Sequence, residues 1–248
     1  MFIFDKKNNM KKIALLLILI PCIGTAQFKD LIKKATQNAT NVKTLSNADI
    51  SGGLKEALNK GITKQVTKLT AVDGFYKNEM VKIIMPDELQ KVDKALRQMG
   101  MANLADEGIK SLNRAAEDAV KEATPIFVES IKTMSITDAK TILMGNDTAA
   151  TTYLKGSTSS DLYTKFSPVV QQSIGKVGAD KIWSSIIKKY NTLPFVSKVN
   201  PDITDYVTNK AMDGVFTMIA VEEKNIRGSL TSRTSDLLKK VFAMQDKK

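Results

Sequence analysis

The sequence contains no histidine, a single cysteine and few aromatic residues, which make up 6% of its 248 residues. The absence of histidine excludes His-based zinc sites, Ser-His-Asp and Cys-His catalytic groups and histidine proton shuttles. Hydrophobic residues make up 43% of the chain and charged residues 25%, a balance typical of a globular protein with a core. The chain is therefore expected to fold, but with a restricted catalytic repertoire.

The N-terminal residues have the three parts of a secretory signal peptide. Lysines precede an apolar run at 13–20, and small residues follow up to Ala26. Because a membrane-spanning helix needs about 20 apolar residues, this short run favours a signal peptide at 1–26 that is cleaved after Ala26. Two alternatives stay open: a lipoprotein anchored at Cys22, which the preceding Pro21 disfavours, and a buried core helix. We therefore expect export to the periplasm or cell envelope, with no cysteine and no membrane span in the mature chain.

Basic residues outnumber acidic ones by 37 to 26 in the whole chain. After removal of residues 1–26 the counts are 33 and 25, a net charge of +8. Positive charge favours anionic partners, which for an exported protein include envelope polymers and lipid headgroups. Nucleic acid is not expected, because the lysines are spread over many predicted helices with few aromatic residues among them. Residues 27–45 combine lysines with helical apolar spacing and predict a tether or weak amphipathic helix, which would suit an anionic membrane surface.

Apolar residues recur every three or four positions through most of the remaining chain, which predicts an all-α fold. We expect a single domain of about eight to ten helices over 46–244, with at most a short extended segment at 79–85. The residues at 156–160 are rich in glycine, serine and threonine and are expected to form a loop between helices. The expected helices are 49–74, 86–99, 103–123, 137–144, 148–154, 179–190, 203–227 and 234–244, and two more begin at Thr124 and Ser167, each before a proline.

No motif carries a catalytic or cofactor signature. Ser173 with Lys176, and Ser185 with Lys188, match the Ser-x-x-Lys spacing of penicillin-recognising enzymes, but the companion Lys-Thr-Gly is absent. About two such matches are expected by chance in a chain this rich in serine and lysine. The sequence also has no glycine-rich phosphate loop with Lys-Ser/Thr and no Asp-rich calcium loop. We therefore expect no cofactor and no metal site.

One acidic residue interrupts an apolar helix face. In a helix over 203–227, Glu222 falls near the middle of an arc that contains Val207, Ala211, Val215, Met218, Ile219 and Ile226. A carboxylate that faces a core is strongly destabilising unless it is paired or protonated. We predict that Glu222 is largely buried and contacts a cation. The candidate cations are Arg227, Arg233, Arg114 and Lys55.

Three interpretations of this position stay open, one of which is a helix that ends early or faces a groove. Glu222 could belong to a buried ion pair that fixes the register of its helix. Alternatively, Glu222 and Glu223 could belong to a functional polar pocket, because Glu223 and Asp205 lie at the edge of the same arc.

Several stretches of the sequence resemble a known family. They are LSNADISGGLKEAL (45–58), MPDELQKVDKAL (85–96), NRAAE (113–117), LPF (193–195), DYVTNKAMDG (205–214), EEKNIR (222–227) and RTSDLL (233–238). Together they resemble exported bacterial proteins catalogued as domain of unknown function 4197, over about residues 45–243. The resemblance implies a mostly helical envelope protein and supplies no catalytic residue. It places eight charged residues inside the matching stretches, which we nominate as a polar cluster: Arg114, Glu117, Asp205, Lys210, Glu222, Glu223, Arg227 and Arg233.

Three functions are compatible with these observations. The first is a non-catalytic envelope module that binds a small anionic ligand or a partner protein through the polar cluster. The second is a hydrolase or lyase with Glu222 and Glu223 or Asp205 as acid and base, because carboxylates are the main acid–base groups left without histidine or cysteine. The third is a structural protein held on a membrane surface by residues 27–45. An open cleft with converging carboxylates would favour the enzyme, and a closed ion pair would favour the module.

Overall fold

The computed structural model describes residues 45–246, apart from 99, 101, 177–183, 185–187, 189–190, 193, 196–197 and 199–201. The predicted signal peptide at 1–26, the predicted tether at 27–45 except for Leu45, and most of the predicted helix at 179–190 lie outside the described residues. The described helices are α2 (Asn47–Thr70), η1 (Asp87–Leu89), α3 (Gln90–Gln98), α4 (Ala102–Val120), α5 (Ala123–Thr133), α6 (Ile136–Met144), α7 (Ala149–Lys176), α9 (Ile203–Gly228), η2 (Leu230–Ser232) and α10 (Asp236–Phe242). The described residues contain no strand, and the predicted all-α class is confirmed.

Helix α2 begins with a capping box. The Ser46 hydroxyl accepts the N–H of Asp49 at 3.0 Å, and the Asp49 carboxylate accepts the N–H of Ser46 at 2.9 Å, so two of the unpaired donors at the start of the helix are satisfied. The helix ends at Thr70, and the predicted end at Gly74 is wrong. Gly74 lies in the following turn, where a Cβ would be 2.4 Å from the carbonyl oxygen of Lys68.

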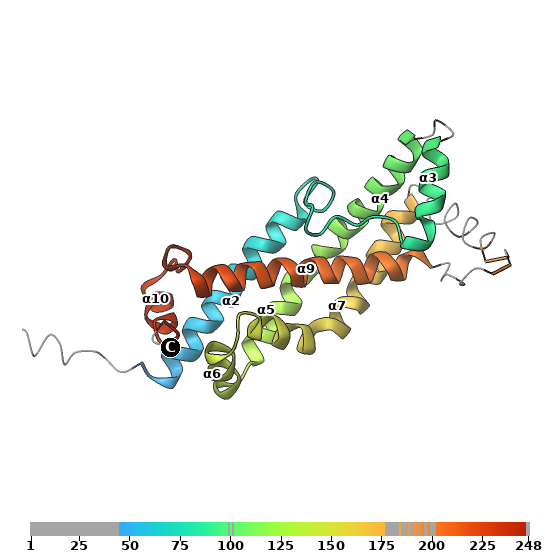
Figure 1. The fold of residues 1–248 in the computed structure, drawn as a ribbon. Helices are drawn as coiled ribbons and strands as arrows, with labels where there is room; N and C mark the ends of the chain where they lie inside the picture. The colour runs from blue at the N-terminus through green and yellow to red at the C-terminus, as the bar shows by residue number, and fades with distance from the viewer. Residues whose placement is uncertain are drawn as a thin grey trace, which may run out of the picture. The chain divides into compact units, whose positions relative to one another are not determined.

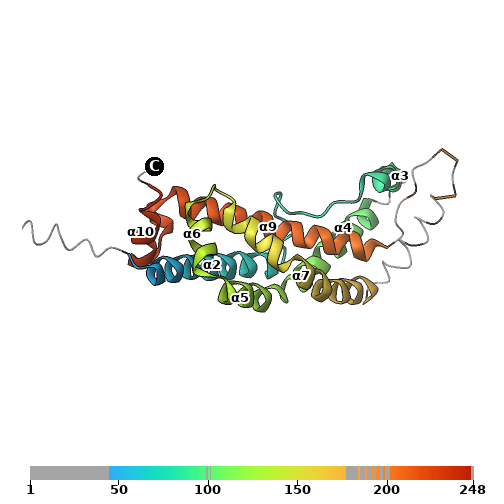
Figure 2. The same cartoon turned by 90° about the horizontal axis from the view of Figure 1, so that it is seen from below.

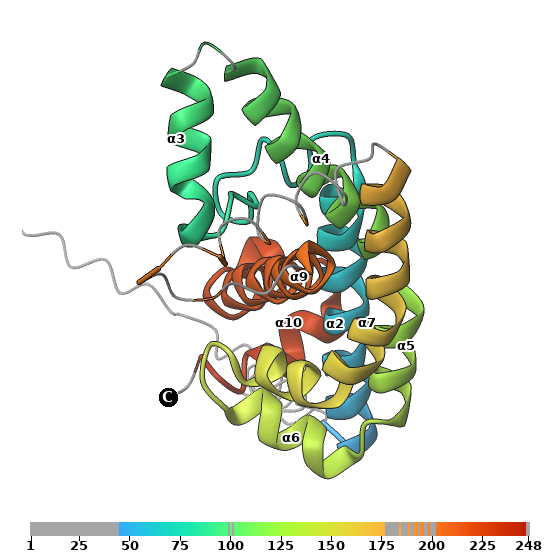
Figure 3. The same ribbon diagram turned by 90° about the vertical axis from the view of Figure 1, so that its right-hand side faces the viewer.

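Helix α9 lies at the centre of the helical arrangement. It packs against α2, α4 and α7, and it crosses in front of them in Figure 1. The view along its axis in Figure 3 shows α2, α5 and α7 on one side of it and α6 below it. Its bounds agree with the predicted 203–227, and the predicted apolar residues such as Val207, Val215 and Ile219 are buried. A charged residue on this face therefore meets other helices instead of water.

Two glycines permit close packing of neighbouring segments. A Cβ on Gly214 of α9 would lie 2.6 Å from the ring of Phe75, and a Cβ on Gly53 of α2 would lie 2.6 Å from Val241 of α10. Figures 1 and 2 show α10 beside the first turns of α2. Glycine at these two positions therefore lets the connection after α2, and the C-terminal helix, pack directly on the long helices.

Helix α7 replaces several predicted elements. The predicted loop at 156–160, the separate helix at 148–154 and the helix start at Ser167 are wrong, because these residues lie in or directly before one continuous helix. The hydroxyls of its middle turns bond within the helix: Thr158 donates to the carbonyl of Leu154 and Ser159 to that of Lys155, both at 2.6 Å. Buried residues at every fourth position hold the whole length against its neighbours: Ala150, Leu154, Thr158, Leu162, Phe166, Val170 and Ile174.

Two other predicted helix starts differ from the structure. Helix α4 begins at Ala102, so Asn103 lies inside its first turn and does not cap it. Helix α5 begins at Ala123, so Thr124 and Pro125 are its second and third residues. Proline is tolerated there because the first N–H groups of a helix have no partner within the helix. The predicted starts at 103 and at Thr124 are thus each one residue late.

Residues 82–86 form an extended connection between α2 and η1. A turn covers 79–81, and no described segment pairs with residues 82–86 as a β-strand. Val81, Ile83 and Met85 are buried, whereas Ile84 is 52% exposed. The prediction of at most a short extended segment at 79–85 therefore agrees with the backbone of its second half. This segment runs beside α9 and forms one wall of the groove described below.

Candidate functional site

Helix α9 carries five of the eight nominated residues, but it separates them into two groups. Asp205 and Lys210 lie in its first turns, and Glu222, Glu223 and Arg227 lie in its last turns. Seventeen residues between Asp205 and Glu222 correspond to about 25 Å along a helix axis. The two groups therefore cannot line one small pocket.

Glu223 and Arg227 form a buried ion pair that joins three helices. Arg227 donates from Nε and Nη2 to Glu223 Oε1 at 3.0 and 2.8 Å. The Glu223 carboxylate also accepts the N–H groups of Ala150 and Thr151, each at 2.9 Å, at the beginning of α7. Negative charge is favourable there because the first N–H groups of a helix point at it. The side chains are 5% and 4% exposed, so this pair is a closed contact.

Arg227 also satisfies the end of α6. Its Nη1 and Nη2 donate to the carbonyls of Leu143 and Ile142 at 3.0 and 2.8 Å. These carbonyls belong to the last turn of α6, where few helical N–H groups are available; that of Ile142 also accepts the N–H of Gly145 at 3.1 Å. The Glu223–Arg227 pair therefore fixes both sides of the connection between α6 and α7 against α9.

Glu222 is buried, with 6% of its surface exposed, and it contacts a cation. Lys64 Nζ lies 2.7 Å from Oε1, and Gln65 Nε2 donates to Oε2 at 2.6 Å. The predicted partners are wrong, because Arg227, Arg233, Arg114 and Lys55 all make other contacts. The reason is helix packing: α2 lies against α9, and its Gly61 brings the helix close to Glu222, where a Cβ would be 3.3 Å from Cγ.

The pairing of Glu222 yields a first prediction. Lys64→Gln removes the cation from a buried carboxylate, and we expect it to lower the free energy of unfolding by about 1–3 kcal/mol. The double variant with Glu222→Gln replaces the ion pair by two neutral amides, so it should lose less than Lys64→Gln alone. Urea unfolding of the single and double variants measures this coupling.

Lys60→Gln is the matched control for this experiment. Lys60 is on the same helix, its side chain is equally exposed at 52%, and it pairs with the half-exposed Glu56. An exposed helical pair contributes about 0.3–0.5 kcal/mol. A loss in Lys64→Gln no larger than in Lys60→Gln would contradict a role for Lys64 in stabilising Glu222.

Arg233 is the largest fully buried side chain among the described residues, and it completes the end of α9. Nε donates to the carbonyl of Ile226 at 3.0 Å and Nη2 to that of Arg227 at 2.8 Å. The guanidinium also holds both carboxylate oxygens of Asp246, and it lies 5.6 Å from the ring centre of Phe242. Arg233 thus links α9 to the C-terminal residues and contacts no other nominated side chain.

Arg114 and Glu117 pair with each other on α4. Arg114 bonds Glu117 and Asp73, and Glu117 accepts the N–H of Phe75 at 3.1 Å. The hydrogen bond to Glu117 raises the pKa of the Arg114 guanidinium above its ordinary value. This group fixes the turn after α2 on α4. Six of the nominated residues are thereby engaged in internal contacts, at separate places in the fold.

The two remaining residues, Asp205 and Lys210, line a groove of about 760 Å³. Residues 81–87 form one wall and the exposed face of the first turns of α9 forms the other; we call this site the α9 groove. Its other α9 residues are Ile203, Tyr206, Asn209 and Asp213, and Asp202, which caps α9, and Lys198 line it as well. The volume lies within the range of about 300–1,000 Å³ that is usual for ligand sites.

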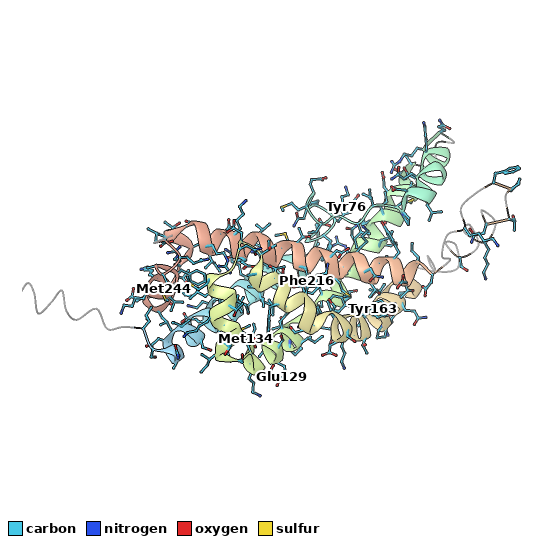
Figure 4. All side chains as sticks on the ribbon, turned by 60° about the horizontal axis from the view of Figure 1, so that its bottom comes forward. Tyr76, Glu129, Met134, Tyr163, Phe216 and Met244 are labelled. Atoms are coloured by element: carbon cyan, nitrogen blue, oxygen red, sulfur yellow. The ribbon has the colours of Figure 1, made fainter. Side chains whose placement is uncertain are left out.

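The carboxylates of the α9 groove have polar partners within the chain. Asp205 accepts the hydroxyl of Tyr163 at 2.7 Å, and this hydrogen bond raises the pKa of the tyrosine. Figure 4 labels Tyr163 on α7 beside the first turns of α9. Asp87 accepts from Gln90, Asp202 accepts the N–H of Thr204, and Asp213 lies 3.8 Å from Lys155. These carboxylates keep their negative charge, because three of the partners are neutral donors and the Asp213–Lys155 pair is exposed.

Two lysines of the groove lie near tyrosine rings, unlike the groove carboxylates, which have hydrogen-bond or ion-pair partners. Lys82 Nζ lies 4.9 Å from the ring centre of Tyr76, and Lys210 Nζ lies 5.8 Å from that of Tyr206. Among the described residues, neither ammonium has a carboxylate within salt-bridge distance. Figure 4 shows Tyr76 on the connection after α2, on the far side of α9 from Phe216. The groove therefore contains two lysines without an ion-pair partner among the described residues, beside four aspartates.

The sequence analysis missed Lys64, Lys82, Tyr206 and Asn113. Asn113 holds the groove wall, because its amide accepts the N–H of Ile83 at 2.8 Å and donates to its carbonyl at 2.7 Å. A partial signal exists for Lys82, which alternates with the apolar residues around it. The other three act across helix contacts that are distant in sequence, and local patterns do not reveal such contacts.

No group of three or more acidic or cysteine side chains in the described part of the chain could hold a metal ion. None of the helices described combines the length and hydrophobicity that crossing a bilayer requires.

The fold and site define an all-α domain whose buried ion pairs fix its helices around α9 and whose groove lies at the beginning of that helix. A family model described as Protein of unknown function (DUF4197) matches residues 44–243, and the chain belongs to this family. No curated protein matches the sequence. No solved structure matches it either.

Proposed function

We propose that the domain is a non-catalytic binding module and that its ligand site is the α9 groove. The ligand presents an anionic group, from a small molecule or a partner protein, to Lys82 and Lys210. The observation that carries this proposal is the difference in pairing: the groove carboxylates accept hydrogen bonds or an ion pair within the chain, whereas the two ammonium groups lie by tyrosine rings and have no carboxylate partner among the described residues. An anion is therefore attracted to the lysines without first displacing an internal carboxylate.

The distribution of charge supports a local site. Residues 45–246 contain 27 basic and 24 acidic side chains, so most of the predicted +8 of the mature chain belongs to other residues. A nearly neutral domain does not attract anions by its overall field. Selectivity for an anion must then come from particular unpaired cations, and Lys82 and Lys210 are such cations.

A carboxylate-dependent hydrolase or lyase that uses Glu222 and Glu223 gains no support from the geometry. Both residues are buried, take hydrogen bonds from Gln65 and from the first turn of α7, and line a mostly apolar cavity of only about 30 Å³. A general acid or base must reach the reacting atoms of a substrate. We therefore retain the binding module in preference to the enzyme.

The test of this proposal is a titration of the isotope-labelled domain with citrate and with inorganic phosphate, followed by NMR. We expect shifts of the amide signals of Ile84, Tyr206 and Lys210. In the double variant Lys82→Gln and Lys210→Gln the dissociation constant for citrate should rise at least about tenfold, because both unpaired charges are lost. Equal affinity in wild type and double variant would contradict the proposed function.

The matched control replaces lysines outside the groove. Lys132→Gln and Lys239→Gln remove the same total charge from exposed side chains on α5 and α10. Their citrate affinity should stay within about twofold of wild type, because exposed charges that are distant from the ligand are screened by salt.

The proposals of export and of membrane-surface attachment have the sequence alone as support. N-terminal sequencing of the exported protein should find Gln27 first, and a lipid-modified Cys22 at the N-terminus would overturn that cleavage. Loss of binding to anionic vesicles on deletion of 27–44 would favour surface attachment, and persistence of binding would contradict it.

A further inference from the structure

The connection after α2 runs antiparallel to α9 along the groove. Two contacts define its register. A Cβ on Gly214 of α9 would lie 3.3 Å from the Cβ of Val81, and the carbonyl of Ile84 accepts the hydroxyl of Tyr206 at 2.8 Å. Figure 1 shows the connection passing along α9 towards α3. Successive residues of the connection therefore lie beside progressively earlier residues of α9.

This register places two lysines at one end of the groove. Lys82 follows the first of these contacts and precedes the second, so it lies level with the part of α9 that carries Lys210. Of the four groove aspartates, Asp213 lies at this end, where it pairs with Lys155 at 3.8 Å. The charge that is left for a ligand at this end is therefore positive.

The other three groove aspartates lie at the opposite end. Asp202 and Asp205 are at the beginning of α9, and Asp87 lies further along the connection in the direction of that helix end. Even with Lys198 counted here, this end has three carboxylates against one ammonium. The side-chain hydrogen bonds that Asp205 and Asp87 accept from the described residues go to Oδ1, so Oδ2 of each carboxylate is available to a cationic group.

Opposite charges are thus separated along the groove by a fixed length of helix. The five residues from Asp205 to Lys210 correspond to about 8 Å along the helix axis, and the eight from Asp202 to about 12 Å. An extended peptide spans about 3.3–3.6 Å per residue, so two or three residues bridge this separation. Between the two ends, the amide oxygen of Asn209 accepts no hydrogen bond from the described residues and can accept a peptide N–H.

We propose that the α9 groove binds free peptides of two or three residues. The terminal carboxylate contacts Lys82 and Lys210, and the terminal ammonium contacts Asp205 and Asp87. This inference rests on the proposed function, because it identifies the anionic group of that ligand as a peptide carboxylate. A ligand with both charges is complementary to both ends of the groove, whereas an anion alone leaves the three aspartates without a partner charge.

The experiment is a calorimetric titration of the folded domain with trialanine. Acetylation of its amino group removes the positive charge and amidation of its carboxylate removes the negative one, so each should raise the dissociation constant at least about fivefold. Alanine should bind at least about tenfold more weakly, because its two charges are too close together to reach both ends. The compound 8-aminooctanoate has a similar charge separation without peptide groups and should also bind more weakly. These comparisons change the ligand alone and do not depend on the stability of a variant.

Asp205→Asn tests the aspartate end of the groove. The asparagine keeps an oxygen that can accept the hydroxyl of Tyr163, so the contact with α7 is retained. The dissociation constant for trialanine should rise at least about threefold, whereas citrate should bind no more weakly than to wild type, because only negative charge is removed. Asp161→Asn is the matched control: Asp161 is exposed on α7 outside the groove, and trialanine should bind this variant within about twofold of wild type.

The outcomes separate this inference from the proposed function. Equal affinity for trialanine and its acetylated form, or for trialanine in wild type and Asp205→Asn, would overturn the peptide assignment, and lysine-dependent citrate binding would leave the proposed function intact. Absence of trialanine binding, or binding of 8-aminooctanoate as tight as that of trialanine, would overturn the assignment as well. Citrate binding that does not depend on Lys82 and Lys210 would instead show that the proposed function itself is wrong.

Discussion

Glu223→Ala should lower the free energy of unfolding by about 3–5 kcal/mol, because it removes one partner of a buried ion pair. Arg227 would stay buried as a charge without its carboxylate, and the N–H groups of Ala150 and Thr151 would lose their acceptor. For a domain of this size a loss of that magnitude corresponds to a fall of roughly 10 °C in melting temperature. Chemical denaturation followed by circular dichroism measures it.

Two further variants interpret the result. Glu223→Gln keeps one acceptor oxygen and should lose less than the alanine variant. Glu129→Ala is the matched control, because Glu129 is 63% exposed and makes only a surface pair with Lys132 on α5. It should change stability by less than about 0.5 kcal/mol. If Glu223→Ala behaved like Glu129→Ala, the junction of α6, α7 and α9 would not depend on this pair.

The position of Glu222 could be predicted from the sequence, but its partner could not. Helical spacing placed it on an apolar face, because that periodicity is a local property of one helix. Which cation meets it depends on the angle and offset at which α2 crosses α9, and these are set by side-chain packing along both helices. Lys64 is therefore found only once the two helices are placed together.

Helix α7 shows the same limit for secondary structure. The residues at 156–160 have loop composition, yet they are helical because Leu154, Leu162 and Phe166 on either side are buried at helical spacing. Tertiary packing outweighs a local propensity of a few tenths of a kcal/mol per residue. The proline at 168 likewise marked a start that the structure does not contain, because a helix held along its length by packing tolerates one missing hydrogen bond.

The candidate site follows the same division between local and distant information. Alternation around Ile83 predicted an extended segment, whereas the groove exists because Asn113 and Tyr206, from α4 and α9, hold that segment on its two sides. Most of the nominated charged residues instead serve the fold. Because those charged residues are held in internal contacts, the functional proposal depends on Lys82 and Lys210, which contribute little to the internal ion pairs.

Arg233→Met should be as destabilising as Glu223→Ala, with a loss of about 3–5 kcal/mol. Methionine fills a similar volume but donates no hydrogen bond, so the carbonyls of Ile226 and Arg227 at the end of α9 would be buried without partners. Asp246 would lose the group that holds the C-terminal turn. Arg233→Lys should not restore stability, because one ammonium cannot reach two carbonyls and a carboxylate in the planar geometry of a guanidinium. Urea unfolding of the three proteins makes the comparison.

The pH dependence of stability separates two contributions of Arg233: its pair with Asp246 and its hydrogen bonds to the carbonyls at the end of α9. Its hydrogen bonds hold the pKa of the Asp246 carboxyl below the ordinary value. Because the folded-state pKa is the lower one, this contribution is present above the unfolded-state pKa of about 4 and is lost as the pH falls through the folded-state value. The difference in stability between wild type and Asp246→Asn should therefore shrink on acidification, whereas the loss in Arg233→Met should persist because the α9 carbonyls do not titrate. A constant difference between wild type and Asp246→Asn from neutral to acidic pH would show that Asp246 contributes nothing as a charged group.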